Sequence, residues 1–259
     1  MNLETIGENI QASYRGAVVR YRTDDEIEVM TEHHRHLKSI LAMLTSSFGR
    51  PITVLDAGCG TGRYFYCLKN VERLLGLDVS AEMLDAARTP VRAREVTAQK
   101  IELQTGNIHL VNFPAQSFDV IYSLGMFGHG CPMTVDLGRK FRDWLAPGGQ
   151  LFFDLVDVAT LPLSRRFRRA LRQRAYPLLP QPIKALLDTR NQVPFCALSK
   201  RELESIMRES GFHDFSVTSQ VCNSPLWHGR HLECVASKPA EAPRTSKPAR
   251  RNEPVAQAA

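Results

Sequence analysis

The chain has 259 residues, of which 43% are hydrophobic, and a formal net charge of +6. This length and apolar content suit one large α/β domain with its own core. No run of about 18 apolar residues occurs, so no membrane-spanning helix is predicted, and the first residues lack the pattern of a secretory signal. The six cysteines form no Cys-x-x-Cys pair. We therefore expect reduced thiols in a cytoplasmic protein.

The charge is unevenly distributed along the chain. Residues 160–190 hold eight Lys or Arg against one Asp, and residues 238–259 hold five against two Glu. The remaining residues carry a net charge of −4. The sequence thus combines a mildly acidic body with two basic segments.

Helical and strand patterns alternate along the chain. Thr23 and Glu26 fit a capping box that opens a helix, with apolar residues at helical spacing as far as Leu44. Short apolar runs predict strands at 52–55, 74–77, 101–105, 118–122 and 151–155. Helical patterns lie between them at 62–70, at 83–88 behind an N-cap at Ser80, and at 134–145.

An Arg- and Pro-rich stretch of about 40 residues follows the fifth predicted strand. A second capping box, Ser199 with Glu202, then opens a helix that stops at Gly211. Runs at 212–218 and 232–236 predict two last strands. Strands that alternate with helices indicate a parallel sheet, and a final pair joined by a loop indicates an antiparallel hairpin at one edge.

A glycine-rich segment, Val-Leu-Asp-Ala-Gly-Cys-Gly-Thr-Gly-Arg, spans residues 54–63 after the first predicted strand. Its glycines let the backbone turn sharply and approach a ligand closely. Ligands of open α/β sheets bind at the carboxyl ends of the strands, where this loop is expected. Asp78 ends the second predicted strand, and its carboxylate can accept hydrogen bonds from both ribose hydroxyls of a nucleoside.

Three kinds of ligand site compete for this loop, besides a plain tight turn. A dinucleotide fingerprint requires glycine at position 63, where the chain has Arg63. A phosphate-binding P-loop requires Gly-Lys-Ser/Thr, which is absent. S-adenosylmethionine (SAM) carries no phosphate, and an aspartate before the glycines suits its cationic end.

Segment 54–63 resembles motif I of the class I SAM-dependent methyltransferases, and further motifs follow in order over about residues 50–155. They are Gly76–Ser80 with Met83 and Leu84 (the acidic motif and its helix), Gly106–Ile108 (the adenine-contacting segment), Phe118–Ile121 (the fourth strand) and Leu145–Gly149 (the turn before the fifth). At Asn107 the family more often has Asp.

The resemblance implies a Rossmann-like sheet of seven mostly parallel strands with an antiparallel C-terminal pair. It also implies a helical segment over residues 1–50 that closes the cofactor pocket, and a methyltransferase domain over 51–237. We expect residues 156–198 to form a helical cap within that domain, and residues 238–259 to form a disordered basic tail.

The resemblance also assigns roles in holding SAM. Gly58, Gly60 and Gly62 would line the methionine part, Asp56 would orient its amino group, and Ser123 and Leu124 would offer backbone to the same end. Asp78 would hold the ribose. Val79 would pack on the adenine face, and Asn107 and Ile108 would meet the adenine edge.

Methyl transfer from a sulfonium is an in-line displacement that chiefly requires alignment, with a base only where the acceptor must lose a proton. His129, in the loop after the fourth strand, is the candidate base; the alternative is a structural or substrate-contacting histidine. Tyr14 and Tyr21 either contact the cofactor or pack against other side chains.

Two further patterns predict no site. His33, His34 and His36 fall on different faces of a helix, so we expect no metal there. Cys131-Pro132 is the reverse of the Pro-Cys pair of cytosine-C5 methyltransferases, so we expect no nucleophile.

Within residues 160–190, apolar side chains at positions 163, 167, 170 and 171 lie at helical spacing beside six of the seven arginines. They suit a cap over the acceptor pocket, a solvated helix, or a peripheral contact with an anionic membrane.

We expect an enzyme that methylates N or O of a small-molecule acceptor. An Asn/Asp-Pro-Pro-aromatic tetrapeptide is absent, which argues against nucleic acid. The alternatives are a lipid or other anionic macromolecular substrate, and a non-catalytic SAM-binding protein; the sequence does not predict the oligomeric state.

Overall fold

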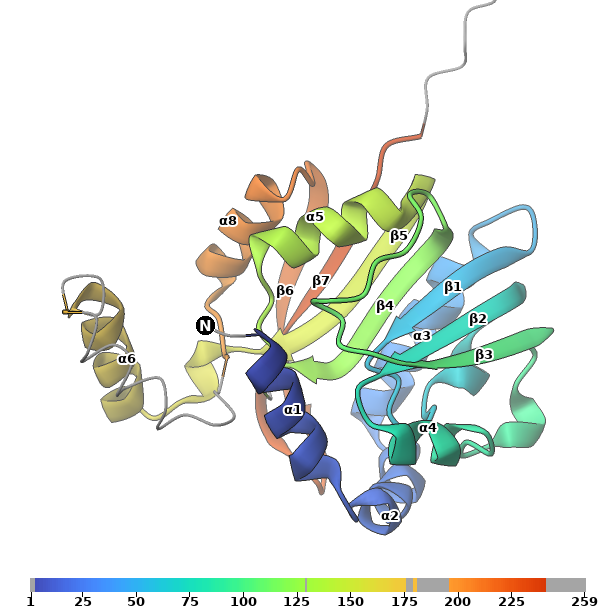
Figure 1. Cartoon of the computed structure of the whole chain (residues 1–259), viewed down its shortest axis with the longest axis horizontal. Helices are drawn as coiled ribbons and strands as arrows, with labels where there is room; N and C mark the ends of the chain where they lie inside the picture. The colour runs from blue at the N-terminus through green and yellow to red at the C-terminus, as the bar shows by residue number, and fades with distance from the viewer. Residues whose placement is uncertain (1–2, 129, 176–178, 181–195, 241–259) are drawn as a thin grey trace, which may run out of the picture.

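The computed structural model describes residues 3–128, 130–175, 179–180 and 196–240 (Figure 1). A seven-stranded sheet of order β3-β2-β1-β4-β5-β7-β6 lies at its centre. The strands are β1 (Ile52–Ala57), β2 (Val71–Asp78), β3 (Lys100–Thr105), β4 (Phe118–Phe127), β5 (Leu145–Val156), β6 (Asp214–Asn223) and β7 (His228–Ser237). The first five strands are parallel, and β7 runs antiparallel to both of its neighbours. The predicted sheet with its antiparallel edge pair is confirmed.

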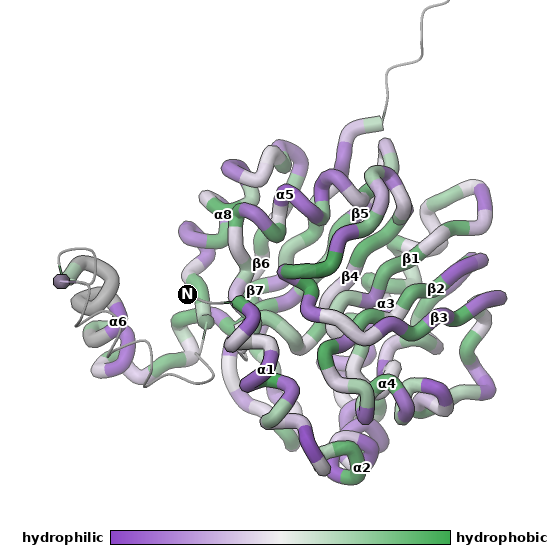
Figure 2. Tube along the Cα trace, in the orientation of Figure 1, coloured by the Kyte–Doolittle hydropathy of each residue, from purple (hydrophilic) through white to green (hydrophobic). Residues whose placement is uncertain are grey.

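Helices cover both faces of this sheet. α3 (Glu32–Ser46) and α4 (Ala81–Ala87) pack with a 3₁₀ turn at Phe65–Cys67 over one face, and α5 (Val135–Trp144) and α8 (Lys200–Glu209) pack over the other. The central strands are buried on both sides, which is why their sequences are continuous apolar runs rather than alternating ones. Figure 2 shows these hydrophobic stretches along β4 and β5.

Two helices precede α3 and lie near the carboxyl ends of the strands: α1 (Leu3–Tyr14) and α2 (Val18–Glu28) (Figure 1). The predicted helix start at Thr23 is wrong. The Thr23 hydroxyl donates to the carbonyl of Val19 within α2, at 3.1 Å. The N-cap of α3 is Thr31, whose hydroxyl oxygen accepts from the amide of His34 at 3.0 Å. The apolar residues thus continue at helical spacing across the boundary between α2 and α3, where Thr31 caps a new helix.

The helix predicted over 62–70 is also wrong, since only the 3₁₀ turn Phe65–Cys67 forms there. Positive φ angles at Gly62 (+78°) and Asn70 (+56°) bound the segment and are incompatible with a continuous α-helix. Other local predictions are confirmed. Ser80 caps α4, Ser199 and Glu202 form the capping box of α8, and Gly211 follows α8 with φ +87°.

A further helix, α6 (Leu163–Ala175), stands away from the body of the molecule (Figure 1). Its Leu163 and Phe167 side chains are 77% and 72% exposed. Residues 176–178 and 181–195 of the predicted cap and 241–259 of the predicted tail lie outside the described residues. None of the helices that the structure describes combines the length and the apolar character needed to cross a membrane.

Candidate functional site

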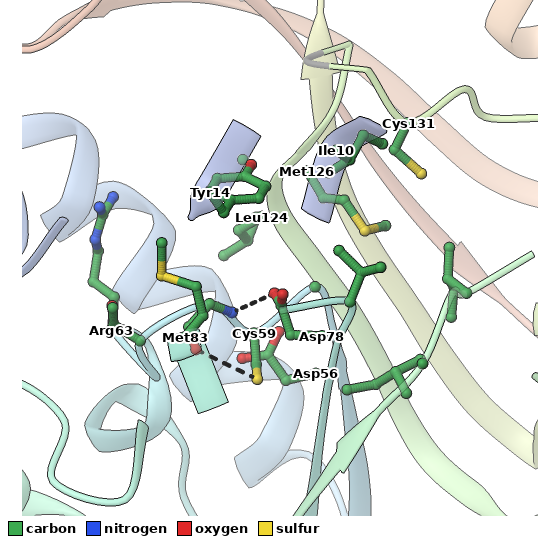
Figure 3. Close-up of a pocket in the computed structure, with 18 of the residues that line it drawn as sticks. Ile10, Tyr14, Asp56, Cys59, Arg63, Asp78, Met83, Leu124, Met126 and Cys131 are labelled. Atoms are coloured by element: carbon green, nitrogen blue, oxygen red, sulfur yellow. Dashed lines mark hydrogen bonds between the residues drawn. The ribbon is translucent and has the colours of Figure 1, made fainter. Parts of the chain in front are cut away.

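A cavity opens at the carboxyl ends of β1, β2 and β4 (Figure 3). Eight of the ten predicted cofactor residues line it: Asp56, Gly58, Gly60, Asp78, Val79, Asn107, Ile108 and Leu124. They come from the loop after β1, the end of β2, the loop after β3 and the end of β4. The parallel sheet gathers these segments at one edge, because the carboxyl ends of parallel strands meet there.

The loop after β1 lies against the cavity as open backbone. Gly58 has φ +82°, and a Cβ there would come within 2.6 Å of the Met126 sulfur, so both the conformation and the space require glycine. Gly60 has φ +52° with open space in front of it. A ligand can therefore approach the backbone of Gly60 directly.

Asp78 connects this loop to the end of β2. Its carboxylate accepts hydrogen bonds of 2.9 Å from the backbone amides of Gly60 and Ser80. Burial raises the pKa of this carboxyl group, while the amides oppose that change. The side chain lies at the floor of the cavity (Figure 3), where its remaining acceptor capacity faces a ligand.

Asp56 is almost fully buried beneath the same cavity. It accepts a hydrogen bond of 2.6 Å from the hydroxyl of Tyr122 on the neighbouring strand β4. Burial raises the pKa of Asp56 to about 8 against the lowering effect of that hydroxyl. A cationic group placed beside this carboxyl would favour its ionised form.

The side chain of Asn107 is engaged on both of its polar atoms. Its Nδ2 donates to the carbonyl of Leu3 in α1 at 2.9 Å, and its Oδ1 accepts from the amide of His109 at 3.0 Å. An aspartate could not make the first of these bonds, because an ionised carboxylate only accepts. Asn107 lines the cavity, and one N–H of its amide holds α1.

Two predicted cofactor residues lie away from the cavity. Gly62 packs against Phe65, where a Cβ would come within 2.8 Å of the ring, so its glycine serves the turn. The Ser123 side chain is fully buried, and its hydroxyl has no hydrogen-bond partner in the structure. Neither residue is among those that line the cavity.

The opposite side of the cavity is formed by α1. Gly7, Ile10 and Tyr14 line it, and Figure 3 shows Ile10 and Tyr14 across the cavity from Asp56 and Asp78. The Tyr14 ring packs edge-on against Tyr21 of α2, with ring centres 5.5 Å apart. Both tyrosines line the cavity, whereas α1 itself was not recognised as a separate helix. A moderately amphipathic pattern over residues 3–14 could have indicated this helix.

A buried ion pair fixes α2 to the glycine-rich loop. Asp25, which is 2% exposed, accepts from the hydroxyl of Thr61 and, at 2.5 Å, from the Nε of Arg63. Thr61 and Arg63 both line the cavity. Asp25 carried no motif in the sequence, so its partners could be found only in three dimensions.

His129 lies outside the described residues, so the structure gives no position for the predicted base. Cys131 lines the cavity wall nearby. Burial raises the pKa of its thiol far above the usual range, which keeps it protonated and unreactive as a nucleophile.

Known proteins share both sequence and fold with the chain. A family model described as a methyltransferase domain matches residues 54–149. The phosphoethanolamine N-methyltransferase of Triticum aestivum is 28% identical over 66% of this chain and 33% of its own length. A malonyl-[acyl-carrier protein] O-methyltransferase of Enterobacter lignolyticus is 27% identical over 64% of this chain and 61% of its own length. The chain thus spans about a third of the first relative.

Solved structures support the fold assignment. A SAM-dependent methyltransferase of Thermotoga maritima superposes with a TM-score of 0.54 at 17% identity, covering 88% of this chain and 99% of the other. Phosphoethanolamine N-methyltransferase 2 of Haemonchus contortus, in complex with SAM, gives 0.54 at 17% identity and covers 79% of this chain and 52% of the other. The family match over residues 54–149 and these neighbours support a class I SAM-dependent methyltransferase with SAM as its cofactor.

Proposed function

We propose that this chain transfers the methyl group of SAM to a nitrogen or oxygen atom of a small-molecule acceptor. The observation that carries this proposal is the single cavity that joins the glycine-rich loop and Asp78 to a wall of α1 side chains. The T. aestivum and E. lignolyticus relatives are named as N- and O-methyltransferases of small or carrier-bound acceptors.

The residues present suit SAM on physical grounds. Asp56 and Asp78 place two carboxyl groups at the cavity floor, which favours a ligand with a sulfonium and an ammonium group. Gly58 and Gly60 leave the backbone open to the methionine part. SAM supplies an already activated methyl group, so the protein is required to align the acceptor with it and to exclude water.

The acceptor, in this proposal, enters between α1 and the end of β4. Ile10, Tyr14, Met126 and Cys131 make that side of the cavity largely apolar and shield it from water. His129 follows this wall in the sequence, and we assign it the role of proton acceptor for substrates that must lose a proton.

The test is formation of S-adenosylhomocysteine by the purified chain with amine, hydroxyl and carboxyl acceptors, starting with phosphoethanolamine and a malonyl thioester. We expect turnover with at least one class, and its loss in Asp78→Ala. If SAM binds with ordinary affinity but no acceptor class is methylated, the chain is a non-catalytic SAM-binding protein and the proposal is wrong.

A second candidate substrate class is an anionic lipid, which the exposed face of α6 favours. Leu163 and Phe167 are exposed on α6, as are Arg165 and Arg166, an arrangement that suits a lipid interface. Sedimentation with vesicles of phosphatidylglycerol and phosphatidylcholine at low salt tests it. The proposal expects binding that Leu163→Ser with Phe167→Ser abolishes; no binding of the wild type excludes it.

A further inference from the structure

A cluster of possible metal ligands lies outside the cofactor cavity, on the sheet face that α3 covers. His33 of α3, Asp154 of β5 and His231 of β7 each bring one ligand atom within 4.8 Å of the others. Asp154 and His231 are buried, and His33 is half-buried. These three residues are more than 70 positions apart from each other in the chain, so only the fold assembles them.

The sheet register explains why the cluster forms. Asp154 of β5 pairs with Glu233 of β7 in the antiparallel ladder, so both side chains project from the same face. His231, two residues before Glu233, projects from that face as well. The first turns of α3 lie over this point, because His36 contacts Glu233 at 2.9 Å and His33 packs near His231 with ring centres 5.7 Å apart.

The three histidines near the start of α3 therefore diverge. His34 is fully buried and contacts the Tyr66 hydroxyl at 2.7 Å, whereas His36 contacts Glu233. Only His33 enters the cluster. The sequence argument that these three histidines cannot share one ion agrees with this geometry. It did not consider that Asp154 and His231, on distant strands, lie beside His33.

One buried polar atom of the cluster makes no hydrogen bond. One oxygen of Asp154 accepts from the amide of Gly125 at 2.6 Å. The other lies 3.2 Å from the Nδ1 of His231, but the direction does not suit a hydrogen bond, and this buried Nδ1 has no hydrogen-bond partner. Asp154 and Glu233 are two neighbouring buried carboxylates on this face of the sheet.

We propose that His33, Asp154 and His231 bind a late first-row divalent metal ion, with Zn²⁺ as the representative ion. Imidazole and carboxylate ligands suit this class, and a set of two His and one carboxylate leaves coordination positions for water. The 3.2 Å between Nδ1 of His231 and Oδ2 of Asp154 matches the roughly 3.3 Å between two ligands of a tetrahedral zinc ion.

Neighbouring groups hold two of the ligands in place. Trp227 stacks on the His231 ring with centres 4.1 Å apart, and the Gly125 amide orients the Asp154 carboxylate. Gly125 also lines the cofactor cavity, so the ion lies behind the cavity wall. An ion there pins the start of α3 to the β5–β7 edge of the sheet.

The test uses the full-length chain without an affinity tag, stripped with a chelator and titrated with Zn²⁺ and then Co²⁺. We expect one ion per chain, a raised unfolding temperature, and a change in fluorescence from Trp227, one of the two tryptophans. Bound Co²⁺ should give visible absorption without the charge-transfer band of thiolate ligands. Mg²⁺ and Ca²⁺ should not compete at equal concentration, because they prefer all-oxygen sites.

Variants locate the site. His33→Ala should weaken Zn²⁺ binding at least tenfold. His228→Ala removes an exposed histidine from the same strand as His231 and should leave binding unchanged. Asp154→Asn, checked for folding by circular dichroism, should weaken binding as well. Equal binding by wild type and His33→Ala, or no binding by the folded wild type, overturns the proposal. None of these readouts depends on methyl transfer.

Discussion

The side-chain amide of Asn107 donates a hydrogen bond of 2.9 Å to the carbonyl of Leu3, and so ties the loop after β3 to the first turn of α1. The helix lies close to this loop, because a Cβ on Gly7 would come within 2.4 Å of the same amide nitrogen. Position 107 thus connects a loop of the cofactor cavity to the helix that covers it.

Asn107→Asp should loosen α1. The substitution replaces the donor with a carboxylate that faces the Leu3 carbonyl, so a favourable contact becomes a repulsive one. We expect faster amide hydrogen exchange over residues 3–14, with little change in the strands. Gln11→Ala, at an exposed position of α1, is the control. Unchanged exchange in Asn107→Asp would show that the bond does not hold the helix.

Asp78→Ala should weaken SAM binding by about tenfold or more. The substitution removes the predicted acceptor for the ribose and leaves the Gly60 amide without its partner, a loss of about 1–3 kcal/mol. Isothermal titration calorimetry measures the effect, with the exposed Asp85→Ala as a control on the following helix. The same affinity in both variants would remove Asp78 from the site.

Asp25→Ala should destabilise the protein by about 3 kcal/mol, because it leaves the largely buried Arg63 guanidinium without its carboxylate. Urea unfolding provides the measurement. Glu26→Ala, at the adjacent exposed position, should change stability by less than about 0.5 kcal/mol. If the two variants unfold at the same urea concentration, the ion pair contributes nothing to the attachment of α2.

The stability of the ligand-free protein should contain a pH-dependent contribution from Asp56. Its pKa is raised from 3.8 to about 8, so between these values the folded protein retains a proton that the unfolded chain has released. Stability therefore falls as the pH rises through this window, by up to about 1.4 kcal/mol per unit.

Asp56→Asn removes this titration while its amide oxygen can still accept from Tyr122. We expect the variant to gain stability relative to wild type as the pH rises from 5 to 8, measured by urea unfolding at several pH values. A stability difference that stays constant over this range would mean that Asp56 is ionised throughout.

Sequence patterns predicted the strands and the cavity floor well, because both depend on local chemistry. Buried parallel strands require continuous apolar runs, and the turn at Gly58 requires a residue without a Cβ. Within residues 52–78, the two strands β1 and β2 and the glycine-rich loop between them follow from these local requirements. The exception is the segment after Gly62, which packs as a buried 3₁₀ turn instead of a helix.

Contacts between distant segments could not be predicted in this way. Asp25 meets Arg63, Asn107 meets Leu3, and Asp154 meets His231, and each pair depends on how separate elements dock. Hydrophobic spacing also concealed the break at Thr31, since apolar residues continue at helical intervals on both sides of it. No local pattern encodes the partner of a buried polar side chain.

The central claim is that the cavity holds SAM with its ribose on Asp78. A crystal structure of the chain with S-adenosylhomocysteine tests it most directly. We expect the ribose hydroxyls within hydrogen-bond distance of the Asp78 carboxylate and the amino-acid end beside Gly58 and Gly60. A ligand bound elsewhere, or an Asp78 carboxylate directed away from the ribose, would contradict the assignment.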